Sequence, residues 1–128
     1  METYFENRFT TYSLVQDILY VYYKENQYIT MAAAKTIVRD RLRLQDHISY
    51  PVLCNLTNIY YIDSYARRYL AHKGSLMTVA VALFCPDKSV SLMGTHYLHV
   101  SVPSVPTEIF SSEQKAFEYL KNFKKSYI

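Results

Sequence analysis

The apolar residues at the start of the chain are spaced in a way that predicts a β-hairpin. Strand-forming residue types fill residues 4–15, and a second apolar run covers Ile18–Tyr23. Gln16 and Asp17, between the two runs, are polar and suit a tight turn, so the strands are expected to pair antiparallel. The turn contains no glycine. Residues 24–28 are polar and are expected to form a loop.

The next segment has the period of an α-helix. Thr30 is a candidate N-cap for a helix that runs to about Gln45. Apolar residues recur on one face of this helix: Ala34, Ile37, Val38 and Leu42. Charged residues are expected to face solvent: Lys35, Arg39, Asp40, Arg41 and Arg43.

A strand and a second helix follow. Pro51 introduces a short apolar run with the composition of a strand buried on both faces. Another apolar run, Ile59–Ile62, leads to Asp63 and Ser64, and either of these residues can cap the next helix. One face of that helix is predicted to contain Ala66, Tyr69, Leu70 and Lys73. Gly74 lies where a left-handed residue commonly ends a helix.

The clearest strand of the chain is the continuous apolar run 77–84. Pro86 then fits the first turn of a third helix. The apolar face of that helix would contain Val90, Met93, Gly94 and Tyr97. A glycine in a helix lowers its stability, so close packing against the sheet is the expected reason for Gly94.

The C-terminal part predicts a loop, a strand and a last helix. The loop, 102–106, contains two prolines and leads to a strand over Thr107–Phe110. Ser111 and Gln114 match a capping box for the last helix. Its apolar stripe consists of Ala116, Phe117, Leu120 and Phe123.

These elements have the order β-β-α-β-α-β-α-β-α. Alternating strands and helices predict an α/β fold, with a mixed, mostly parallel sheet covered by helices. The length of 128 residues fits a single domain over 1–128, and an apolar content of 50% argues against disorder. Fourteen tyrosines and no tryptophan favour a large half-buried surface, such as an interface.

Charge and targeting signals argue against a nucleic-acid-binding, secreted or membrane-spanning protein. A net charge of +3 is too small to predict nucleic-acid binding, and the aromatic residues lack the pattern of an RNA-binding sheet. The N-terminal residues lack the features of a signal peptide, and no apolar run is long enough to span a membrane. We therefore expect a cytoplasmic protein in which Cys54 and Cys85 are reduced and buried.

The sequence contains no recognisable set of catalytic or metal-binding residues. Its only glycines, Gly74 and Gly94, are too few for a P-loop or a dinucleotide fingerprint. A hydrolase signature is also missing. His96 and His99 have no third ligand near them in the sequence, so we expect surface histidines. The prediction is a protein that is not an enzyme and needs no cofactor or metal.

One local motif resembles the hallmark of the STAS domain, the domain of anti-sigma factor antagonists. In that family a buried strand leads through a short loop to Asp-Ser-Ser-Gly at the start of a helix. The residues that match at the same spacing are Asn55, Leu56, Asp63 and Ser64. Tyr65 and Ala66 replace the second serine and the glycine of the family pattern.

The whole chain is also similar to a group of short, uncharacterised bacterial proteins described as STAS-like or STAS/SEC14-like. The segments that carry this similarity are Pro51-Val52-Leu53, Ala66-Arg67 and Pro106-Thr107-Glu108-Ile109-Phe110. The resemblance implies a STAS-like fold over nearly the whole chain.

The STAS resemblance implies that Ser64 is the phosphoacceptor of a partner-switching mechanism. A phosphate at a helix N-terminus would meet free backbone N–H groups, and Arg67 and Arg68 lie one turn later. The simpler alternative is that Asp63 or Ser64 only caps the helix. Four tyrosines in the same stretch predict an aromatic contact surface: Tyr60, Tyr61, Tyr65 and Tyr69.

The leading hypothesis is a non-enzymatic regulatory or interaction module that docks a protein partner through residues 63–70 and the preceding loop. Self-association as a homodimer would use the same face or the edge of the first hairpin. The predicted interaction residues are Tyr60, Tyr61, Asp63, Tyr65, Arg67 and Arg68. The alternative is a carrier of a small apolar ligand or lipid, as the SEC14-like resemblance implies. A carrier would need an apolar pocket on the order of several hundred Å³.

Overall fold

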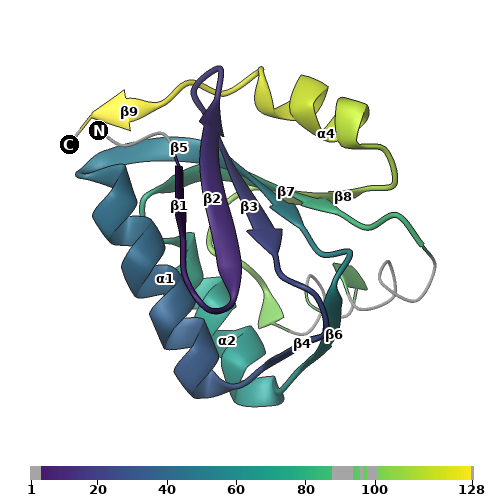
Figure 1. Ribbon diagram of the computed structural model, residues 1–128. Coiled ribbons are helices and arrows are strands. Elements are labelled where there is room, and N and C mark those ends of the chain that lie inside the picture. The colour runs from purple at the N-terminus through teal and green to yellow at the C-terminus, as the bar shows by residue number, and fades with distance from the viewer. Residues whose placement is uncertain (1–3, 88–93, 96, 98–100, 128) are drawn as a thin grey trace.

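The computed structural model describes residues 4–87, 94, 95, 97 and 101–127. One twisted sheet runs through the molecule in the strand order β1-β2-β3-β5-β7-β8 (Figure 1). Its strands are β1 (Tyr4–Glu6), β2 (Thr10–Val15), β3 (Ile18–Tyr23), β5 (Ile48–Asn55), β7 (Thr78–Phe84) and β8 (Thr107–Phe110). The first three pair antiparallel, and β3, β5, β7 and β8 are parallel. A short strand, β9 (Ser126–Tyr127), pairs antiparallel with the start of β5. The predicted mixed, mostly parallel sheet is confirmed.

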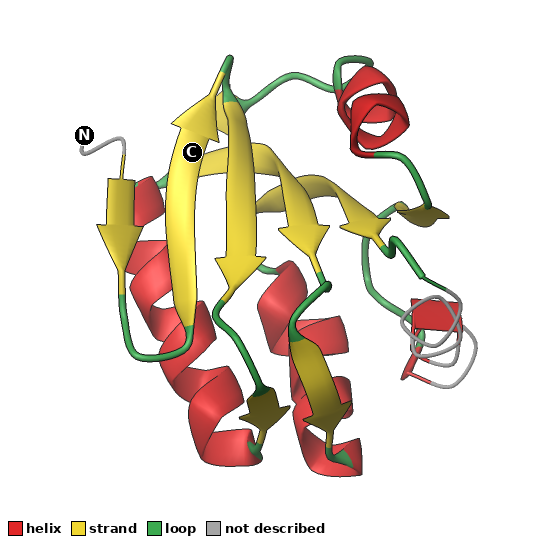
Figure 2. Ribbon diagram, turned by 45° about the vertical axis from the view of Figure 1, so that its right-hand side comes forward, coloured by secondary structure: helices red, strands yellow, loops and turns green. Residues whose placement is uncertain are grey.

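Helices cover both faces of this sheet (Figure 2). The helices α1 (Met31–Gln45) and α2 (Ser64–His72) belong to one apolar cluster, and α4 (Glu113–Leu120) belongs to the other. Successive side chains of β5 point to opposite faces, so Val52 joins the first cluster and Leu53 the second. Cover on both faces explains why β5 and β7 are continuous apolar runs.

Local sequence signals place the start of α1 correctly and the start of α4 one residue too early. The Thr30 side chain accepts a hydrogen bond from the Ala33 N–H at 3.2 Å and caps α1 as predicted. The N-cap of α4 is Ser112, which accepts from the Lys115 N–H at 3.3 Å, so the prediction of Ser111 is wrong by one residue. Ser112 has the extended backbone of an N-cap, with φ −121° and ψ 128°, which lets its side chain reach the third residue of the helix.

The left-handed end predicted for α2 is wrong. The chain continues from His72 into a 3₁₀ turn, η1 (Lys73–Ser75), and Gly74 does not have a positive φ. Positive φ occurs instead at Met77, immediately before β7. The Gly74 carbonyl accepts a hydrogen bond from the Arg41 guanidinium at 3.0 Å, which holds the 3₁₀ turn against α1.

Gly94 packs against the sheet as predicted. A Cβ atom at this position would lie 3.2 Å from both the Cys85 Sγ and the Ile109 Cδ1. Gly94 and Thr95 are helical, whereas Val90 and Met93, which were predicted to share the face of this third helix, lie outside the described residues. No helix in the described ranges is both long and apolar enough to cross a membrane.

Two strands form a small second sheet that the sequence analysis did not predict. These are β4 (Gln27–Ile29) and β6 (Ile59–Ile62), which pair in parallel. The Gln27 N–H donates to the Asn58 carbonyl at 3.1 Å, and the Asp63 N–H donates to the Ile29 carbonyl at 3.1 Å. The predicted loop over 24–28 is therefore partly a strand. The pairing extends the fold beyond the main sheet and positions the start of α2 (Figure 1).

Two charged residues of α1 are buried, contrary to prediction. The Asp40 carboxylate accepts hydrogen bonds from the Asn7 amide at 2.9 Å and from the Arg39 guanidinium at 3.2 Å. Arg41 is only 4% exposed and bonds to backbone carbonyls beyond α2. Long-range partners replace the water that these groups lose, which allows charged residues on an inward face.

Candidate functional site

The residues of the predicted site gather where β5, β6 and α2 meet. β5 ends at Asn55, at the carboxyl edge of the parallel strands, where open α/β sheets commonly hold their sites. The Asn55 side-chain oxygen Oδ1 accepts from the Thr57 N–H at 3.0 Å and from the Thr57 hydroxyl. Asn55 therefore fixes the loop that leads into β6.

A polar network connects this loop to the other side of the sheet. The Asn55 amide donates to the Tyr20 hydroxyl at 3.0 Å, and Tyr20 in turn donates to the Glu113 carboxylate. Burial raises the pKa of Tyr20, and its hydrogen bond to Glu113 raises it further, so the phenol stays protonated and donates. The first turn of α4 is thereby tied to the motif loop.

Asp63 is the N-cap of α2. Its carboxylate oxygen Oδ1 accepts from the Ala66 N–H at 2.8 Å, and its own N–H is held by the Ile29 carbonyl. Ser64 is the first residue of the helix, and its side chain is exposed. The sequence left open whether Asp63 or Ser64 caps the helix, and the structure shows that Asp63 is the cap.

The two arginines predicted to pair with a phosphate have other contacts here. The Arg67 guanidinium donates to the Ile62 carbonyl at 2.8 Å, which ties the helix back to β6. The Arg68 guanidinium lies 5.7 Å from the centre of the Tyr65 ring, a cation–π distance. Both side chains belong to the same end of the molecule as Ser64.

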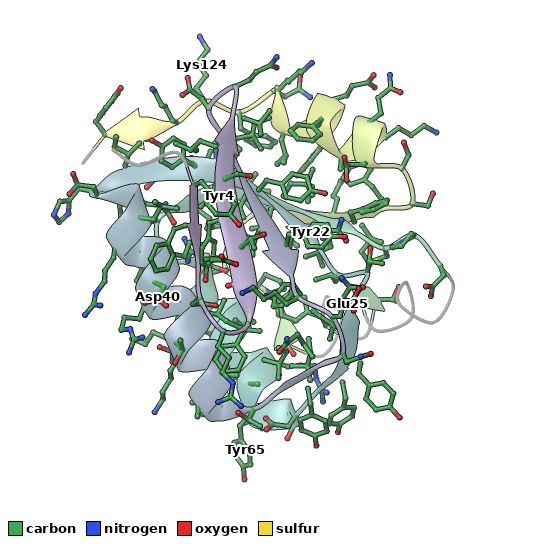
Figure 3. All side chains as sticks on the ribbon, viewed as in Figure 1. Tyr4, Tyr22, Glu25, Asp40, Tyr65 and Lys124 are labelled. Carbon is green, nitrogen blue, oxygen red and sulfur yellow. The ribbon has the colours of Figure 1, made fainter. Side chains whose placement is uncertain are left out.

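Four exposed tyrosines occupy this end of the molecule, and we call them the tyrosine surface. They are Tyr28, Tyr60, Tyr61 and Tyr65, with exposed fractions of 54%, 79%, 45% and 68%. The rings of Tyr28 and Tyr61 lie side by side on β4 and β6, with centroids 5.0 Å apart. Tyr65 points away from the body of the protein (Figure 3).

The tyrosine surface differs from the predicted set in two members. Tyr69 is partly buried and packs against the main apolar cluster, so it is not counted in the tyrosine surface. Tyr28 was not predicted, because it lies in the segment expected to be a loop and reaches Tyr61 only through the β4–β6 pairing. An aromatic residue in a polar stretch was the one available signal for Tyr28.

The cysteines do not have the properties of catalytic nucleophiles. Both are free; Cys85 is buried, whereas Cys54 is only partly buried, contrary to prediction, and lines an internal cavity. Burial raises the pKa of Cys54 to about 12 and that of Cys85 to about 11, so both stay thiols at neutral pH. Within the described ranges no group of three or more His, Cys, Asp or Glu residues could hold a metal ion. His96 and His99 lie outside those ranges.

The fold is STAS-like, and solved structures with the same architecture match this chain. An uncharacterized protein of the DUF3478 family with a SpoIIAA-like fold, from Shewanella loihica PV-4, matches with a TM-score of 0.56 and 14% identity. That match covers 87% of this chain and 91% of the other. A serine-to-glutamate variant of RsbS from Moorella thermoacetica matches with a TM-score of 0.57 and 17% identity, over 91% of this chain and 97% of the other.

The particular family follows from the sequence itself. Residues 12–124 match the family described as Domain of unknown function (DUF7793), and the chain belongs to that family. No curated protein matches the chain.

Proposed function

We propose that this protein is a non-enzymatic interaction module that docks a protein partner through the tyrosine surface and the first turn of α2. The observation that carries the proposal is the clustering of four exposed tyrosines on two paired strands and one helix start. Tyrosine is enriched in the energetically dominant positions of interfaces, because its ring buries area and its hydroxyl bonds at the rim. The β4–β6 pairing and the Asp63 cap hold these side chains on regular elements.

The finer part of the proposal is that Ser64 controls this docking. Its exposed hydroxyl is accessible to a modifying enzyme and lies beside Tyr65, a member of the tyrosine surface. Phosphorylation would add roughly two negative charges at neutral pH. The helix N-terminus would tolerate these charges, while a docked partner would have to accommodate them. The STAS-like fold, shared with the serine-to-glutamate RsbS structure, supports a test of the same kind of substitution here.

We further propose that the protein acts in the cytoplasm, with an unidentified protein as the principal partner and a second copy of the chain as the alternative. The edge strand β1 gives self-association another route, because Tyr4 and Phe5 on it are exposed.

Affinity capture from a lysate of the source organism tests the docking surface. The baits are the wild-type protein, Tyr60→Ser, Tyr65→Ser and, as the matched control, Tyr127→Ser, which is 69% exposed on β9, away from β4 and β6 (Figure 1). We expect a specific partner to be held by wild type and the control and reduced at least tenfold by either surface variant, by quantitative mass spectrometry. Equal retention by all four baits would refute the proposed surface.

The switch is tested separately with Ser64→Glu and Ser64→Ala baits. We expect both to keep the fold and only the glutamate to change partner retention or sedimentation behaviour. Identical behaviour of the two, with a partner that does depend on Tyr60, would remove the switch and leave the docking surface intact.

The predicted alternative, a carrier of a small apolar ligand or lipid, is not proposed for a ligand of lipid size. The apolar cavity between the sheet, α1 and α2 has a volume of about 80 Å³. Drug-sized and lipid ligands need roughly 300 Å³ or more. The cavity instead suits a much smaller molecule.

A further inference from the structure

The cavity is lined largely by residues of the main apolar cluster, and several elements contribute to its walls. The sheet contributes Val21, Val52 and Leu83, α1 contributes Ile37 and Val38, and α2 contributes Leu70. These side chains make most of the lining apolar. One charged residue, the buried Arg41, also lines the cavity.

Arg41 has no carboxylate partner among the described residues. Its guanidinium donates to the Gln45 side-chain oxygen and to the Gly74 and Leu76 carbonyls, each carbonyl at 3.0 Å. All of these acceptors are neutral. The adjacent Asp40 does not pair with Arg41, because its carboxylate accepts hydrogen bonds from Asn7 and Arg39.

Among the described residues, the titratable groups that act on the guanidinium are uncharged at neutral pH. They are Cys54, Tyr12 and Tyr23. Burial raises the pKa of all three above their ordinary values. An arginine side chain keeps its proton in proteins, so the wall of this cavity carries an unneutralised positive charge.

We propose that this cavity is a binding site for a short-chain monocarboxylate. The carboxylate would pair with the Arg41 guanidinium, where an anion relieves the cost of a buried cation far more than a neutral carbonyl does. The hydrocarbon part would lie against Val21, Val52 and Leu83. A guanidinium has five N–H donors, and Arg41 uses three of them on Gln45, Gly74 and Leu76, so two remain for a carboxylate oxygen.

The size of the cavity selects the length of the acid. A cavity of about 150 Å³ accommodates benzene. The volume of about 80 Å³ therefore fits an acid with a few carbon atoms, such as propionate. This site shares no residue with the tyrosine surface, so the two proposals stand or fall separately.

A nuclear magnetic resonance titration with sodium propionate tests the site directly. The chain has two glycines, Gly74 and Gly94, and both line the cavity, so their amide signals are well-separated reporters. We expect both signals to shift with a saturating, millimolar dependence on propionate. Equimolar sodium chloride and propan-1-ol, which lack the carboxylate, should leave them in place. Absence of shifts with propionate would refute the site, and equal shifts with chloride would show an adventitious ion only.

Two variants separate the charge from the space. Arg41→Gln keeps amide donors near the carbonyls but removes the charge, and Val52→Ile keeps the charge but fills part of the cavity. Each should raise the Kd for propionate at least tenfold, and Val52→Ile remains informative if the Arg41 variant does not fold. Unchanged affinity in the folded variants would overturn the proposal.

Hexanoate should bind wild type at least tenfold more weakly than propionate, and equal binding would refute the size argument.

Discussion

At the scale of single residues, the neighbours Asp63 and Ser64 at the start of α2 have different roles. Asp63 satisfies the backbone N–H of Ala66, and Ser64 remains exposed and has no part in the cap. A residue without a structural role can be modified without loss of the fold. This separation is the physical basis for treating Ser64 as a regulatory position and Asp63 as a structural one.

Replacement of each residue by alanine checks this division. Asp63→Ala should lower the free energy of unfolding by about 1 kcal/mol, because an N-cap bond is lost. Ser64→Ala should change it by less than about 0.5 kcal/mol, as expected for a surface substitution. Urea denaturation followed by circular dichroism measures both values. A larger loss for Ser64→Ala than for Asp63→Ala would contradict the assignment of the cap.

At the scale of elements, the β2–β3 hairpin closes without the residue that its turn favours. Gln16 and Asp17 both have positive φ, at 52° and 63°, in a two-residue turn. This geometry matches the right-handed twist of the strands and is usually occupied by Asn-Gly. Pairing in register from Thr10–Tyr23 to Val15–Ile18 compensates for an unfavourable turn sequence.

The double substitution Gln16→Asn with Asp17→Gly should therefore stabilise the protein. We expect a gain of about 1 kcal/mol, since both new residues adopt positive φ with less strain. The lost contact from Asp17 to Lys125 is on the surface and contributes little. Gln16→Val is the opposite control and should destabilise, because a β-branched residue resists positive φ. Thermal denaturation of the three proteins measures the order of stability.

At the scale of the whole molecule, a buried tyrosine connects the hairpin to the helical layer. Tyr12 on β2 is fully buried, and its hydroxyl donates to the Ile37 carbonyl of α1 at 2.6 Å. Burial raises the pKa of Tyr12 from its ordinary value of 10 to about 12. The folded protein therefore keeps this proton at pH values where the unfolded chain has lost it.

This pKa shift predicts loss of stability in alkali. The contribution is complete below pH 10 and is lost as the pH rises from 10 to about 12, because the unfolded state releases its proton first. Two pKa units correspond to about 3 kcal/mol. Urea denaturation at pH 8, 10 and 11 should show the decline, and Tyr12→Phe should start lower but decline less. Parallel declines in the two proteins would assign the alkaline loss to other groups, such as Cys85, whose pKa is also raised.

The sequence by itself determined the features that depend on neighbours along the chain. The cap at Thr30, the central apolar strands and the mixed α/β order follow from period, composition and capping, which act within a few residues. Gly94 was also predictable, because a helical glycine implies close contact. The motif from Asn55 to Ser64 indicated the position of the candidate site, although it left open which residue caps α2.

Only the tertiary structure decided the features that depend on distant partners. Asp40 and Arg41 are buried because Asn7 and Gly74, each 33 positions away, supply hydrogen bonds that replace water. Tyr28 joins Tyr61 because β4 pairs with β6, and no local pattern encodes that pairing. A helical period shows which side of α1 faces inward, but the cost of placing a charge there depends on groups that only the folded chain brings close.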